Sequence, residues 1–246
     1  MRESAEKYIR LEQNMYSKGA NNPIFSYIAQ NLRSELTKIT SNIEYAQLSG
    51  DVSLLDDSKY SSQYMLRLIE CYLDFLDQTN ISQNVEPVSL SALLKNVASS
   101  MAPYAKWQQC DLDLNVAGRY QPVMANREVL NTVLTSLSSV FIVAQSEVKH
   151  KARPVITYAV TRSNKGITAG IYSNVEAINS AMLKKARNLY GKSGNPMSAS
   201  VSNGSAGLYM ADSLLNNMSY GLRVSKFHKM TGLSASFEPS KQIALV

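Results

Sequence analysis

Apolar residues recur every three or four positions along the first third of the chain, which is the period of one face of an α-helix. Asn22 and Pro23 give a helix start signal. The stripe that follows contains Phe25, Ile28, Leu32, Leu36, Ile39, Ile43 and Ala46. Ser49-Gly50-Asp51 interrupts it. The pattern therefore predicts one long helix that ends near residue 49.

A second amphipathic stripe follows this break, within residues 54–79. It contains Ser61, Met65, Leu68, Tyr72 and Phe75. Two long helices with a short connection predict a helical hairpin. Because a lone hairpin leaves part of its apolar stripe exposed, we expect a homodimer in which two hairpins form a four-helix bundle.

After a polar stretch around Pro87, helix and strand patterns alternate. We expect helices at 89–106, 126–140, 177–189 and 206–217, the second of them capped by Asn126. Strands are expected at 110–116, 121–124, 154–161, 167–172, 221–228 and 231–237. This mixture predicts an α+β fold whose second part is an α/β sandwich. The predicted organisation is an N-terminal extension (1–21), a hairpin (22–80), a linker (81–88) and an α/β domain (89–246).

Composition agrees with two modest globular domains, since 45% of the 246 residues are hydrophobic and 18% are charged. Cys71 and Cys110 have no neighbouring metal-ligand pattern, so we expect buried thiols and no metal site. The N-terminus lacks an apolar leader, and the apolar run 140–144 is too short to cross a bilayer. These features predict a soluble cytoplasmic protein that does not enter a membrane.

The order of elements resembles the dimerisation and catalytic domains of two-component sensor histidine kinases, whose catalytic half is of the GHKL ATPase type. The phosphoacceptor motif of that family is traceable in Gln30-Asn31-Leu32-Arg33-Ser34-Glu35-Leu36-Thr37. The resemblance places Gln30 at the phosphoacceptor position, and a carboxamide cannot form a phosphoramidate. Glu35 replaces the family's proline, which favours an unbroken helix.

The resemblance also locates an eroded nucleotide pocket. Serines stand where the family has metal-binding asparagines, and the glycine-rich motifs survive only in Gly204-Ser205-Ala206-Gly207-Leu208. The implied degenerate pocket consists of Ser136, Ser139, Ser173, Asn174, Gly204 and Gly207. We therefore expect no cofactor, no tight ATP binding and no enzymatic activity. The chain is also similar to histidine phosphotransferases with a dead ATPase half, but these still need a bundle histidine.

Two functions follow from these observations. The resemblance implies a non-catalytic adaptor, or pseudokinase, whose first hairpin helix contacts a response-regulator receiver domain. The implied contact residues are Gln30, Asn31, Arg33, Ser34 and Lys38. The alternative is a nucleic-acid or polyanion binder, because residues 149–192 hold nine Lys and Arg residues and one acid, Glu176, with interleaved tyrosines. A solvated basic face would have the same composition.

Overall fold

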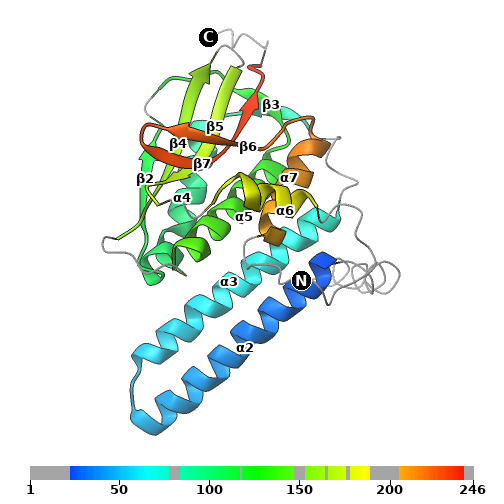
Figure 1. Ribbon diagram of the computed structural model, residues 1–246. Coiled ribbons are helices and arrows are strands. Elements are labelled where there is room, and N and C mark those ends of the chain that lie inside the picture. Colours follow the sequence, from blue (N-terminus) through cyan, green and yellow to red (C-terminus); the bar gives the residue numbers. More distant parts are fainter. Residues whose placement is uncertain are drawn as a thin grey trace. The chain divides into compact units, whose positions relative to one another are not determined.

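The computed structural model describes residues 23–77, 84–116, 118–146, 153–163, 166–175, 178–188 and 205–240. The chain forms two compact units (Figure 1). Unit 1 contains the chain up to Leu73, and unit 2 contains Asp74–Arg187 together with the chain from Asn203 onward. The predicted extension, residues 1–21, lies outside the described residues.

Unit 1 is the predicted helical hairpin. Its helices are α2 (Pro23–Ser49) and α3 (Ser53–Leu76), although the last turn of α3 already belongs to unit 2. Gly50 has a φ of 74°, a left-handed conformation that glycine adopts without strain. Asp51 then caps α3, because its Oδ1 accepts hydrogen bonds from the Ser53 backbone N–H at 3.0 Å and the Ser53 hydroxyl at 2.7 Å.

Unit 2 contains four helices and seven strands among its described residues. They are β1 (Glu86–Val88), α4 (Leu90–Trp107), β2 (Asp111–Asn115), β3 (Val123–Ala125), α5 (Arg127–Ser146), β4 (Val155–Ser163), β5 (Gly166–Ser173), α6 (Ser180–Arg187), α7 (Ser205–Asn217), β6 (Arg223–Phe227) and β7 (Met230–Phe237). The main sheet has the order β2-β4-β5-β7-β6. Its strands pair antiparallel except for β2 and β4, which are parallel. The predicted mixture of helices and antiparallel strands is therefore confirmed.

The end of the predicted linker (81–88) is part of a β-strand. Glu86–Val88 forms β1 and pairs antiparallel with β3 in a separate two-stranded sheet. Glu86 also accepts a hydrogen bond from Arg127 Nε at 2.7 Å. Proline has no backbone N–H to donate, but it is tolerated at position 87 because β1 is an edge strand, with one side unpaired among the described residues. The strand was missed because its partner lies far away in the sequence.

The caps and the core agree with the apolar pattern. Asn126 was expected to cap α5, and its Oδ1 accepts the Val129 backbone N–H at 3.1 Å. Leu94, Met101 and Ile142 are all fully buried. By length and composition alone α5 could cross a membrane, but 67% of that segment is buried inside the protein, as in a core helix.

A buried tyrosine in β4 leads to a stability prediction. Tyr158 is 0% exposed, and its hydroxyl has no hydrogen-bond partner among the described residues. Burial raises the pKa of this phenol, and the nearby Ser138 hydroxyl opposes the shift. Ser138 itself donates to the Leu134 carbonyl oxygen at 2.6 Å. Because an unpaired buried hydroxyl is costly, Tyr158→Phe should raise the free energy of unfolding by about 1 kcal/mol in urea titrations.

Tyr220→Phe is the matched control for this prediction. The Tyr220 hydroxyl donates to the Met124 carbonyl oxygen at 2.8 Å, so its removal should lower the free energy of unfolding by about 1 kcal/mol. Equal destabilisation by the two substitutions would contradict the idea that Tyr158 is unpaired.

Candidate functional site

The predicted partner surface lies on α2. Arg33, Ser34 and Lys38 are exposed in the hairpin, whereas the side chains of Gln30 and Asn31 lie outside the described part of the structure. The opposite side of α2 carries Ile28, which is 3% exposed. These three residues are thus accessible to a partner. An ordinary solvated helix face would show the same exposure.

The two serines that replace metal-binding asparagines on α5 behave differently. The buried Ser136 hydroxyl donates to the Gly207 carbonyl oxygen of α7 at 3.1 Å. The Ser139 hydroxyl instead donates to the Thr135 carbonyl oxygen within its own helix, also at 3.1 Å. Of these two serines, Ser136 is therefore the one whose side chain hydrogen-bonds to α7 in the described structure.

Val140 takes the next position on that face, one helical turn after Ser136. A Cβ atom on Gly207 would lie 2.6 Å from Val140 Cγ2 and 3.3 Å from the Ser136 Oγ. The start of α7 and the side of α5 therefore touch closely, and we call this contact the α5–α7 seam. The other predicted glycine, Gly204, lies outside the described residues.

The two residues predicted at the end of β5 are both used within the protein. Ser173 is 1% exposed, and its Oγ accepts hydrogen bonds from Gln145 Nε2 at 2.9 Å and from the Val175 backbone N–H at 3.2 Å. Asn174 Oδ1 accepts the Val155 backbone N–H at 2.9 Å. These bonds stabilise the loop after β5 and leave Ser173 inaccessible.

Gln145, near the end of α5, was missed by the sequence analysis. It is 1% exposed, and its Nε2 also donates to the Val175 carbonyl oxygen at 3.3 Å. Its Oε1 has no hydrogen-bond partner among the described residues. The available signal was a polar residue one turn after the buried Phe141 on an otherwise apolar stripe. The side-chain amide of Gln145 therefore lies directly beside the Ser173 hydroxyl.

The described residues of this region do not fit a magnesium nucleotide. The side-chain oxygens of Ser136 and Ser173 are engaged by other protein groups, and no carboxylate stands among the predicted pocket residues. Magnesium is usually held by carboxylates together with phosphate oxygens. In the described part of the chain, no group of three or more His, Cys, Asp or Glu side chains could hold a metal ion.

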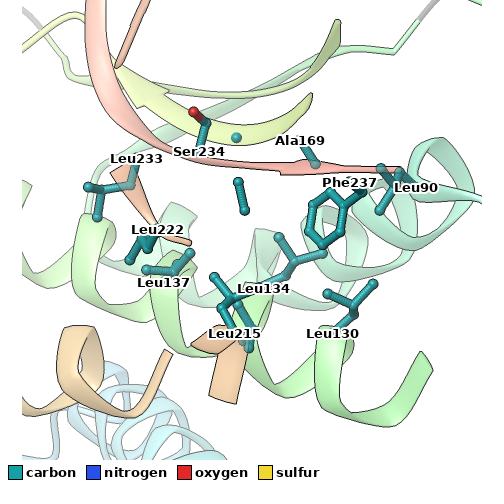
Figure 2. A pocket seen from close by; sticks show the side chains of 13 residues that line it. Leu90, Leu130, Leu134, Leu137, Ala169, Leu215, Leu222, Leu233, Ser234 and Phe237 are labelled. Atoms are coloured by element: carbon teal, nitrogen blue, oxygen red, sulfur yellow. The ribbon is translucent and has the colours of Figure 1, made fainter. Parts of the chain in front are cut away.

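A cavity lies elsewhere in unit 2, between α5, α7 and the sheet. Its volume is about 10 Å³, and its lining is almost wholly apolar, with Leu134, Leu137, Leu215, Leu233 and Phe237 among the residues (Figure 2). That is roughly the space of one water molecule, which would need polar partners to stay there. The cavity is a packing defect of the core, too small for an organic ligand.

Cys110 leads to a prediction about reactivity. The residue is 2% exposed, and burial raises its pKa to about 11, with a smaller opposing effect of the Arg153 charge. Since the thiolate is the reactive form, the folded protein should not react with Ellman's reagent at pH 8, and urea should release the reaction. The raised pKa also stabilises the fold fully below pH 9, and this contribution should be lost as the pH rises towards 11.

Cys110→Ala and Cys71→Ala are the controls for this experiment, because both thiols are free and buried. Cys110→Ala should remove part of the alkaline loss of stability. In Cys71→Ala the remaining cysteine is Cys110, which should still react with Ellman's reagent only after urea is added. Rapid labelling of Cys110 in the native protein would contradict its burial.

No protein-family model and no curated protein matches the sequence, but solved structures match the fold. Acinetobacter baumannii histidine kinase AdeS matches 85% of this chain and 98% of its own at a TM-score of 0.52 and 13% identity. Full-length ShkA in complex with AMPPNP matches 76% of this chain and 39% of its own at 0.51 and 14% identity. The catalytic domain of histidine kinase ThkA matches 64% of this chain and 97% of its own at 0.50 and 12% identity. The chain therefore has a histidine-kinase-like core, with a helical hairpin followed by a GHKL-like α/β domain.

Proposed function

We propose that this protein is a non-catalytic, histidine-kinase-like signalling adaptor that works in the cytoplasm through protein–protein contacts. The observation that carries the proposal is the internal use of the nucleotide-pocket residues. Gln145 binds Ser173, and Ser136 binds Gly207 across the seam. Gln30 at the phosphoacceptor position supports the same conclusion, because a carboxamide cannot accept the phosphoryl group.

Calorimetric titration with ATP and MgCl₂ tests the loss of nucleotide binding. We expect no heat of binding and no thermal shift, because groups that could contact a nucleotide are already bonded within the protein. A radiolabelled ATP assay on the same sample should show no phosphorylated protein. Saturable binding or phosphotransfer would contradict the proposal.

Exposed apolar residues on the hairpin support a homodimer. Leu36 and Ile43 lie two turns apart on α2 and are 55% and 38% exposed. Leu55 and Leu66 lie three turns apart on one side of α3 and are 46% and 58% exposed. A second hairpin would bury these side chains in a four-helix bundle, at a gain of about 25 cal/mol per Å² of apolar surface.

Leu66→Glu tests the dimer, because it would place a charge in the bundle. We expect dimers for the unchanged protein and monomers for this variant by light scattering. Leu48→Glu is the matched control, since Leu48 is 87% exposed on a different side of α2 and should leave the dimer intact. A monomeric parent protein would contradict the bundle.

The proposed partner is a response-regulator receiver domain that contacts the exposed face of α2. Arg33→Glu should abolish binding of a receiver domain in interferometry, because it reverses a charge on that face. Lys59→Glu is the matched control, since Lys59 is also exposed but lies on α3. Equal loss in the two variants would indicate nonspecific charge attraction. The nucleic-acid alternative stays a prediction, since four of the nine cations in residues 149–192 lie outside the described residues.

A further inference from the structure

The outer strand of the main sheet has one open side. β6 is last in the strand order, and among the described residues it pairs only with β7 (Figure 1). The hairpin closes with the two-residue turn His228-Lys229, so Phe227 and Met230 form its first bonded pair. Bonding then alternates along the strand. Val224 and Lys226 therefore direct their backbone N–H and C=O groups away from β7.

The same edge is positively charged. Arg223, Lys226 and Lys229 are exposed, and residues 213–237 contain no Asp or Glu. None of the three cations forms an ion pair within the described part of the chain. The Arg223 guanidinium donates only to the Ser236 hydroxyl. A negatively charged partner would meet uncompensated cations here.

The positions of these charges define a pattern for the partner. Side chains alternate between the two faces of a strand, so Arg223 and Lys226 lie on opposite faces of the sheet. Arg223 shares its face with Phe227, whose ring lies 5.2 Å from that of Tyr172. An added strand would therefore place one acidic residue on each face, three positions apart.

We propose that the open edge of β6 binds an extended acidic segment of a partner protein as an additional strand. Backbone hydrogen bonds supply the affinity, and the two acidic residues select the segment. The cations on β6 keep the β6 edges of two copies apart, as lysines do on many edge strands. They are complementary to an acidic strand. This surface belongs to unit 2, so it is distinct from the α2 face of the proposed adaptor function.

Fluorescence anisotropy on the full chain tests the proposal with a labelled peptide of threonine and valine that carries two glutamates three positions apart. We expect saturable binding that weakens with added salt. Two further peptides carry N-methyl groups on one or the other set of alternate amides. Only one of these should bind, because only one set of N–H groups faces β6. Equal binding of both would overturn strand addition.

Matched variants separate edge recognition from general attraction. Lys226→Glu/Lys229→Glu should weaken peptide binding at least about tenfold, because the attractive cross-strand pair of Lys226 becomes repulsive and the neighbouring turn cation, Lys229, is reversed as well. Lys184→Glu/Lys185→Glu makes the same charge change on the exposed side of α6 and should leave binding unchanged. Equal losses in the two double variants would overturn the proposal.

Val224→Pro tests the backbone contribution. It removes an N–H group on the open side without removing a bond to β7, so we expect a normal circular dichroism spectrum and about tenfold weaker binding. Unchanged peptide binding by this folded variant would overturn the proposal. Tighter binding of an oligonucleotide of equal charge, or self-association that Lys226→Glu/Lys229→Glu abolishes, would identify a different occupant and would also overturn it.

Discussion

Arg187→Leu should lower the free energy of unfolding by about 3 kcal/mol, as measured by urea titration. Asp212 in α7 is 0% exposed, and its two oxygens accept hydrogen bonds from Arg187 Nε at 2.9 Å and Nη2 at 2.8 Å. Nη2 also donates to the Leu222 carbonyl oxygen at 2.7 Å. Without the guanidinium the carboxylate stays buried and uncompensated. The Arg187 side chain is itself 45% exposed, and solvent screens its charge. The expected loss of unfolding free energy is therefore near the lower end of the range for breaking a buried ion pair.

Two controls distinguish this pair from general helix effects. Lys184→Leu changes an exposed cation of the same helix and should alter stability by no more than about 0.5 kcal/mol. Arg187→Leu/Asp212→Leu removes both charges and should recover much of the loss, because no buried charge remains. A double variant as unstable as Arg187→Leu would show that the packing of the arginine stem, and not the ion pair, stabilises α6 on α7.

Gly207→Ala should lower the free energy of unfolding by about 2 kcal/mol. The new methyl group would lie 2.6 Å from Val140 Cγ2, and Val140 is only 5% exposed, so it has little room to move. The better helix propensity of alanine returns at most about 1 kcal/mol. The separation of α5 and α7 must therefore increase at the seam, at the expense of the Ser136 hydrogen bond.

A double-mutant cycle with Val140→Ala tests this explanation. Val140→Ala alone should destabilise the protein through a small cavity, but the new space accommodates the methyl group of Gly207→Ala. The combined variant should therefore be more stable than the sum of the two single effects, by about 1 kcal/mol or more. Strict additivity would mean that the seam is looser than the contact distance indicates.

The periodic segments of this protein were predictable from sequence because local chemistry fixes them. The break at Gly50 and the cap at Asn126 were read correctly, and both act within a few residues of the helix end. Strand β1 was missed, since Pro87 and its polar neighbours are typical of a linker and only the distant Val123–Ala125 strand makes them extended.

The candidate site was less predictable, because its contacts join residues that are distant in sequence. The family motif gives Ser136 and Ser139 equivalent positions. The packing of α7 against α5 decides that Ser136 and Val140 contact Gly207. Gln145 and Asp212 were overlooked, although each is a polar residue at an apolar position of a core helix. That pattern marks buried hydrogen bonds and ion pairs, but the sequence does not say with which residue they form.

The α5–α7 seam has a consequence for how the protein would behave in a cell. A protein that binds a nucleotide only when folded gains stability in proportion to the logarithm of nucleotide concentration. On the proposed loss of nucleotide binding that gain is absent, because Ser136 and Gln145 form their hydrogen bonds within the protein. The fraction of folded protein would then be set by the chain itself. On the proposed function, the adaptor stays assembled during starvation and responds to the abundance of its partners, not to the energy supply.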